Sequence, residues 1–159
     1  QALVAPTSFG TARRSVVGWD NGRLAMILAV LQTRCGLNLS SSDVYLNVAG
    51  GLRISEPAAD LAVAAALISA FSGQLLPSRI VVFGEIGLGG EIRGVKQTEV
   101  RLKEAEKLGF GCALIPESLP NRVKKKTSET VIDINTMASL KDLLKIFEGS
   151  DNTSNTMAH

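Results

Sequence analysis

The alternation of hydrophobic and polar positions divides the chain into helices and strands along its whole length. Leu24, Ile27 and Leu31 recur at helical spacing before Gly36, which predicts a helix that ends at this glycine. Similar spacing predicts further helices at 56–73, 96–111 and 139–149. Short apolar runs bounded by glycine, proline or polar residues predict strands at 1–7, 43–51, 112–118 and 130–136. A further strand is predicted between Gly10 and Gly18, and strand-like runs are predicted within 78–95.

The order of these elements indicates the class of fold. Strands and helices alternate, and the glycines within Gly87–Gly90 predict one hairpin turn between two strands. We therefore expect an α+β or α/β layered domain over 1–149. The polar residues 150–159 predict a flexible C-terminal tail. Because the chain starts with Gln rather than Met, we expect it to be cut from a longer protein.

The second predicted helix differs from the others because it is almost entirely small or aliphatic. Pro57 suits the first turn of a helix, and Glu56 and Asp60 place negative charge at the positive end of its dipole. A helix that is apolar on all sides is typical of a protein core. We therefore expect this helix to pack within the domain rather than to form an interface.

Composition limits the possible functions. Of the 159 residues, 45% are hydrophobic but only 4% are aromatic, so we expect an aliphatic core. The net charge of +2 is too small to indicate a nucleic-acid partner by itself. No apolar run reaches the roughly 18 residues that cross a membrane, so no membrane partner is expected. Cys35 and Cys112 lack metal-ligand spacing and are expected to be buried, reduced thiols.

Several chemistries are excluded by motifs that the sequence lacks. It contains no phosphate-binding loop of the G-x-x-x-x-G-K-[ST] type, and its glycine-rich stretch lies between strands rather than before a helix. His159, at the terminus, is the only histidine. A Ser-His-Asp triad and a histidine-based metal site are therefore excluded.

Three blocks of the chain resemble the proteolytic domain of Lon proteases. They read NVAGG-(5)-PAAD, VVFGEIGLGGEIRGV and KEAEKLGFGCALIPES, and the resemblance covers nearly the whole of 1–149. It implies the Lon proteolytic-domain fold, with a mixed sheet and flanking helices, which is similar to the second domain of ribosomal protein S5. In Lon this fold carries a Ser-Lys dyad, in which a lysine of lowered pKa activates the serine.

Neither dyad position retains its reactive side chain. Lon carries the serine in a D-G-P-S-A-G turn, which matches 55–60 and places Ala58 at the nucleophile position. The lysine position, near the start of the helix after the hairpin, is occupied by Glu99. A methyl group cannot attack a carbonyl, so the resemblance implies no catalytic residue. The alternative is a displaced dyad of Ser55 and Lys96, whereas the simpler expectation is a helix cap and a solvated charge.

A closer resemblance is to the Lon-like C-terminal domain of the RadA (Sms) family of DNA repair proteins. It is carried by QALVAPTSFGTARRSVVGWDNGRLAMILAVL, VAGGLRISEPAADLA and FGEIGLGGEIRGV, because P-T-x-x-G-x-x-R-R and E-P-A-x-D-L-A are typical of this family. The resemblance implies that the parent protein also has a four-cysteine zinc finger and a RecA-like ATPase. ATP, Mg²⁺ and Zn²⁺ would then be cofactors of the parent, and none is expected in this domain.

The family resemblance implies a role in assembly rather than catalysis. The parent is expected to be an ATP-dependent DNA helicase that forms a hexameric ring and acts in branch migration. This domain is then a pseudoprotease that supports the homo-oligomer and binds single-stranded or branched DNA without sequence preference. An active peptidase and a pure oligomerisation scaffold without DNA contact are the alternatives. The implied compartment is the bacterial cytoplasm or, for a plant source, the chloroplast or mitochondrial matrix.

Basic residues supply the candidates for DNA contact. In a Lon-like layout, Arg53 and Arg93 are expected to approach the former substrate groove. Further candidates add positive charge elsewhere: Arg13, Arg14, Arg101, Lys124, Lys125 and Lys126. Arg and Lys bind phosphates without reading sequence, so such binding should weaken with salt. Arg13 and Arg14 suit salt bridges between subunits equally well, and the three lysines suit a solvated loop.

Overall fold

The computed structural model of the chain describes residues 1–8, 10–117 and 131–148. Its strands are β1 (Ala2–Pro6), β2 (Arg14–Val17), β3 (Ser42–Asn47), β4 (Ile80–Val82), β5 (Glu85–Ile86), β6 (Ile92–Arg93), β7 (Cys112–Pro116) and β8 (Asp133–Met137). Its α-helices are α1 (Asn21–Cys35), α2 (Asp60–Ser72), α3 (Thr98–Lys107) and α5 (Leu140–Glu148). Two short 3₁₀ helices, η1 (Ala49–Gly51) and η2 (Pro57–Ala59), lie between β3 and α2. The predicted mixed α/β class is confirmed.

The strands form two separate three-stranded sheets and one hairpin. The first sheet has the order β1-β3-β2, with β1 antiparallel and β2 parallel to β3. The second sheet has the order β4-β7-β8 and is parallel throughout. The predicted hairpin is confirmed as the antiparallel pair β5 and β6. The resemblance to Lon implied a mixed sheet, and the structure has one mixed sheet and one parallel sheet.

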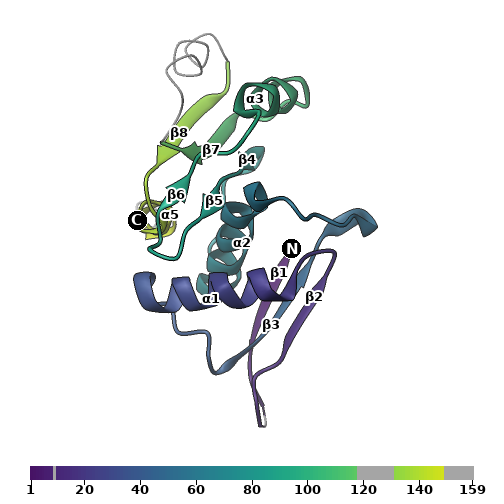
Figure 1. Cartoon of the computed structure of the whole chain (residues 1–159), viewed down its shortest axis with the longest axis vertical. Helices are drawn as coiled ribbons and strands as arrows, with labels where there is room; N and C mark the ends of the chain where they lie inside the picture. The colour runs from purple at the N-terminus through teal and green to yellow at the C-terminus, as the bar shows by residue number, and fades with distance from the viewer. Residues whose placement is uncertain (9, 118–130, 149–159) are drawn as a thin grey trace, which may run out of the picture.

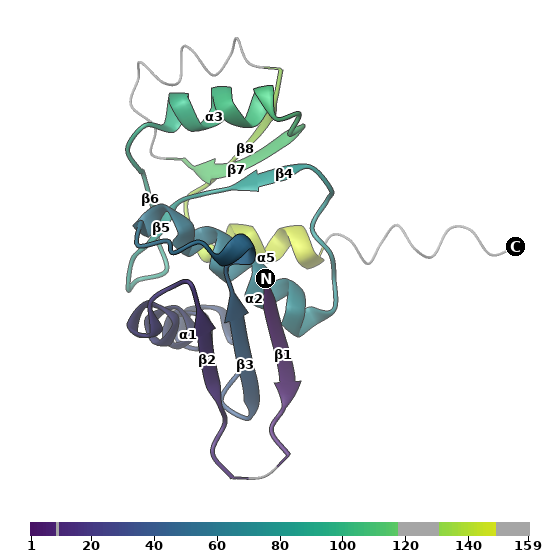
Figure 2. The ribbon, with the colours of Figure 1, turned by 90° about the vertical axis from the view of Figure 1, so that its right-hand side faces the viewer.

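The helices connect the two sheets. The β1-β3-β2 sheet and the β4-β7-β8 sheet lie toward opposite ends of the molecule, and α2 runs between them (Figure 1). Figure 2 shows α3 on one face of the β4-β7-β8 sheet and α2 and α5 on the other. Two hydrophobic clusters follow from this arrangement: a large one around α1, α2 and α5, and a smaller one beneath α3.

Helix α2 forms part of the large cluster, as its apolar sequence predicts. Leu61, Ala64, Leu67 and Ile68 are all at most 2% exposed. The helix packs against β1, α1 and α5, so its expected role in core packing is confirmed. Among the described residues, no helix has the length and apolar character needed to cross a bilayer.

Residues near the ends of helices predicted some element boundaries correctly and others to within two residues. Gly36 caps α1 in the left-handed conformation with φ of 71°, as predicted. Helix α3 begins at Thr98 rather than at 96, because Gln97 adopts φ of 60° and interrupts the helical backbone. Cys35 and Cys112 are free but only half-buried, whereas full burial was predicted. Burial raises the pKa of the Cys35 thiol.

Candidate functional site: the turn at Ala58

The turn before α2 packs its tip into the smaller hydrophobic cluster. Ala58 is 4% exposed and belongs to the same cluster as Phe83, Leu102 and Ala105. The N–H of Gly84 donates to the Ala58 carbonyl at 2.8 Å. These contacts hold a buried methyl group at the place where the resemblance to Lon puts a nucleophile.

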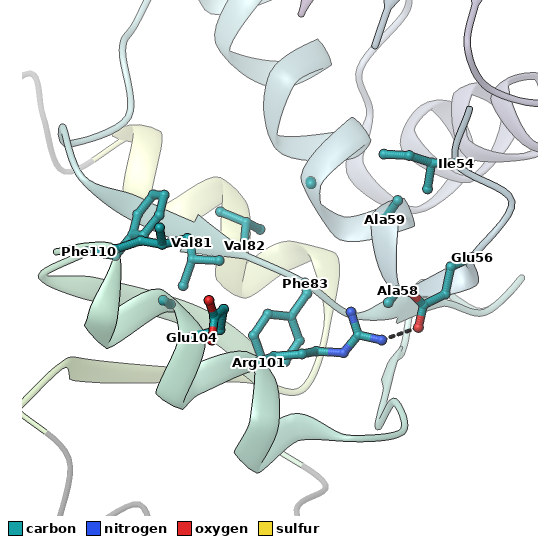
Figure 3. Close-up of a pocket in the computed structure, with 13 residues that line it drawn as sticks. Ile54, Glu56, Ala58, Ala59, Val81, Val82, Phe83, Arg101, Glu104 and Phe110 are labelled. Carbon is teal, nitrogen blue, oxygen red and sulfur yellow. Dashed lines mark hydrogen bonds and ion pairs between the residues drawn. The ribbon is translucent and has the colours of Figure 1, made fainter. Parts of the chain in front are cut away.

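A cavity of about 410 Å³ opens beside this turn, and we call it the Ala58 cavity (Figure 3). Its walls come from the turn, from the start of α2, from β4 and from α3, and they are mostly aliphatic or aromatic. It is lined by Ile54, Glu56, Ala58, Ala59, Ala62, Val81, Val82, Phe83, Arg101, Glu104, Ala105, Leu108 and Phe110. A concave apolar surface of this size is typical of a binding site.

An ion pair crosses the rim of the Ala58 cavity. The Arg101 guanidinium donates to the Glu56 carboxylate, so α3 is joined to the turn (Figure 3). It also lies 5.7 Å from the centre of the Phe83 ring, and its Nε donates to the Lys96 carbonyl at 3.0 Å. Arg101 is therefore occupied by intramolecular partners, although it was predicted as a DNA contact.

The other residues considered for catalysis do not meet at this cavity. Glu99 lies in the first turn of α3 and is not among the lining residues. Ser55 lies in a different pocket, and no hydrogen bond joins it to the exposed Lys96. The prediction that Ser55 caps the helix is wrong, because Glu56 holds the cap position of η2 and no side chain makes a capping bond there.

Asp60 anchors the first turn of α2 from within the protein. Its side chain is 0% exposed and accepts from Arg23 Nε at 2.9 Å and Nη2 at 2.5 Å. It also accepts from the Ile86 N–H at 3.2 Å. The hydrogen bond to Asp60 raises the pKa of Arg23. This group ties α1, α2 and β5 together directly behind the turn.

Two more predicted DNA contacts are engaged within the molecule. Arg14 donates to the carbonyls of Arg13, Ser42 and Leu39, so it secures the loop before β3. Arg93 pairs with Glu91 at 2.5 Å and lies away from the Ala58 cavity. A hydrogen bond from the backbone N–H of Glu91 and, second in size, the pairing with Arg93 lower the pKa of the Glu91 carboxyl.

Arg53 has a different environment, in a pocket of about 340 Å³ that we call the Trp19 pocket. The pocket is lined by Val16, Gly18, Trp19, Asp20, Arg53, Ile54 and Ser55. Neither Arg53 nor Arg93 lines the Ala58 cavity. Their contact with DNA stays a prediction. Arg13 is exposed, and Lys124, Lys125 and Lys126 lie outside the described residues.

The sequence did not reveal two of the residue pairs that organise this site. Arg23 with Asp60 and Glu56 with Arg101 each join segments far apart in the chain. A buried aspartate in an otherwise apolar helix was the available signal for the first pair, because buried charges need partners. Among the described residues, no cluster of His, Cys, Asp or Glu is suited to hold a metal ion.

Comparison with known proteins supports a relationship to DNA repair proteins. The chain is 66% identical over 116 residues to the DNA repair protein RadA of Brucella abortus, covering 73% of this chain and 25% of the relative. It is 52% identical over 151 residues to the DNA repair protein RadA of Rickettsia bellii, covering 94% of this chain and 32% of the relative. A protein-family model described as subunit ChlI of Mg-chelatase matches residues 14–118.

The chain belongs to the family that this ChlI model describes. Its predicted relation to RadA is confirmed by the RadA homologues, which cover most of the chain. The ChlI match extends from β2 to the end of β7, so it includes the turn at Ala58 and the hairpin. The chain spans about a quarter to a third of the length of the RadA relatives.

Proposed function

We propose that this chain is a non-proteolytic Lon-like domain of a RadA-type repair protein. In this role it supports assembly of a homo-oligomeric ring, a hexamer, and contacts DNA without sequence preference. The observation that carries the proposal is the buried methyl group of Ala58 beneath the Glu56–Arg101 ion pair. A peptidase needs a nucleophile within hydrogen-bond reach of a base. Ala58 supports the proposal because it supplies only a buried methyl group at the position where the resemblance to Lon puts that nucleophile.

The DNA-binding part of the proposal rests on Arg53 with Arg13. Both side chains are exposed and form no ion pair with the described residues, whereas Arg14, Arg93 and Arg101 are engaged. A phosphate therefore reaches Arg53 and Arg13 without displacing an internal partner. In this proposal, ATP hydrolysis with its Mg²⁺ and the Zn²⁺ of the zinc finger belong to other parts of the parent protein.

The DNA contact is tested by fluorescence anisotropy with labelled single-stranded and branched DNA at low and moderate salt. Replacing Arg53 and Arg13 by Ala is expected to weaken binding to all sequences and to reduce the salt slope by about one for each phosphate that is no longer bound. Arg93→Ala is the matched control, because this side chain is already paired. Unchanged affinity and salt slope in the double variant would favour an oligomerisation scaffold without DNA contact.

The absence of peptidase activity and the oligomeric state are tested separately. Casein and fluorogenic peptides should stay intact, and a serine-directed inhibitor should leave the mass of the protein unchanged. Turnover that Ser55→Ala abolishes would establish the displaced dyad instead. Analytical ultracentrifugation with and without DNA should show a hexamer, and a monomer under all conditions would contradict the assembly role.

A further inference from the structure

Among the described strands, β4 is an edge of the β4-β7-β8 sheet with no further strand beside it. The Arg79 carbonyl accepts from the Gly111 N–H at 2.9 Å, and the Phe83 N–H donates to the Leu114 carbonyl at 3.2 Å. Backbone groups of successive residues in a strand point to opposite sides. The N–H and carbonyl of Val82 therefore point away from β7, toward the open edge.

The turn at Ala58 already pairs with this edge at Gly84, two residues after Val82. The backbone of Gly84 points to the same side as that of Val82, where Gly84 bonds to Ala58 and Leu61. At Val82 the described part of the chain supplies no such partner. The edge is thus paired at Gly84 and open beside the Ala58 cavity, which Val82 itself lines.

The cavity lies where the side chains of an added strand would point. Its walls are α2 on one side of β4 and α3 on the other, with Val81, Val82 and Phe83 between them (Figure 3). A strand paired with β4 would lie about 4.8 Å away and would direct alternate side chains to opposite faces. The backbone of that strand would lie between α2 and α3, and one of its faces would direct an apolar side chain into the cavity.

The charges of the lining favour a peptide over a nucleic acid. The cavity is lined by the carboxylates of Glu56 and Glu104 and by one guanidinium, Arg101, which is paired with Glu56. Glu104 is in turn paired with Lys107 at 3.3 Å. The lining therefore offers no unpaired cation to a phosphate, and its apolar walls fit an aliphatic side chain.

We propose that the β4 edge and the Ala58 cavity bind an extended segment of a partner protein as an added strand. The segment places an aliphatic side chain in the cavity. Its main chain pairs with Val82, which gives affinity, and the cavity selects the side chain, as in other cases of strand addition. This binding is independent of the proposed DNA contact.

The test uses fluorescein-labelled short peptides in which Val, Leu or Phe alternates with Thr between terminal lysines. Anisotropy should show saturable binding, and N-methylation of the central peptide nitrogens should abolish it. Ala62→Leu fills the cavity from α2 and should weaken binding by at least about tenfold. Ala66→Leu is the matched control, because it lies one turn later on α2 and does not line the cavity.

Amide hydrogen exchange locates the binding. The Val82 amide should gain protection when peptide is added, while the Val81 amide, which faces β7, should not change. The proposal is overturned if no peptide binds at about millimolar concentration, or if Ala62→Leu binds as tightly as Ala66→Leu. Protection of Val82 that rises with protein concentration alone would also overturn it, by assigning the edge to a second copy. Cleavage of a bound peptide would support the docking site and contradict the non-proteolytic function.

Discussion

The ion pair between Arg23 and Asp60 allows a stability prediction worked from its geometry. Asp60→Asn keeps the shape of the side chain and one acceptor oxygen for the Ile86 N–H but removes the charge that faces Arg23. Removing one partner of a buried pair costs about 3–5 kcal/mol. Because the Arg23 side chain is 28% exposed and water reaches it, we expect the lower end, about 3 kcal/mol.

The reverse substitution should cost more. Arg23→Ala leaves the Asp60 carboxylate, which is 0% exposed, without its cation, so we expect about 5 kcal/mol. Urea unfolding followed by circular dichroism measures both losses. With a slope of about 2 kcal/mol per molar, Asp60→Asn should lower the midpoint by about 1.5 M. Lys145→Ala, which breaks the exposed pair with Asp142, is the control and should cost less than about 1 kcal/mol.

Two results would refute this reasoning. A loss below about 1 kcal/mol for Asp60→Asn would mean that the pair contributes no more than a surface salt bridge. A milder effect of Arg23→Ala than of Asp60→Asn would mean that burial of the carboxylate is not the dominant cost.

Three further predictions concern single side chains. Hydrogen bonds from Lys145 and, to a lesser extent, from Ser139 lower the pKa of Asp142. The ionised carboxylate therefore stabilises the folded state above its ordinary pKa of 3.8, and this contribution is lost as the pH falls through the lowered pKa. Asp142→Asn should therefore lower the free energy of unfolding by about 1 kcal/mol at neutral pH, and by less near pH 3, as measured by urea unfolding. Gly18→Ala should lower the free energy of unfolding by at least about 2 kcal/mol, because φ is 80° and a Cβ would lie 2.4 Å from the Leu52 carbonyl oxygen; a loss below about 1 kcal/mol would contradict that clash. Arg101→Ala removes a partly exposed pair and should cost no more than about 2 kcal/mol in the same assay, including the contact with Phe83; a larger loss would mean that this arginine holds α3 in place.

The elements that could be predicted from the sequence are those whose signals are local. Gly36 ends α1, and the glycines around Gly90 form the hairpin, because a left-handed residue is needed at each place. The apolar face of α2 also needs only its own residues to be recognised. The start of α3 was placed two residues too early, because Gln97 adopts a left-handed conformation that its residue type does not predict.

The candidate site depended on contacts that sequence spacing does not contain. Ala58 could be placed at the tip of a turn by its motif, and the structure adds that it is buried. Arg93 was predicted as a DNA contact, and in the structure its guanidinium forms an ion pair with Glu91, two positions earlier in the chain. From the sequence alone Arg101 is expected to be an unpaired surface cation. Its partner Glu56 is 45 positions away, and only the folded chain brings the two side chains together.

The backbone bonds at the turn have a consequence for how this position changes over evolutionary time. The Ala58 carbonyl accepts from Gly84, and the Leu61 N–H donates to the Gly84 carbonyl at 3.1 Å. Both bonds use main-chain atoms, so the path of the turn does not depend on which small side chain stands at position 58. One small side chain can therefore replace another at this position in the course of evolution while the fold persists.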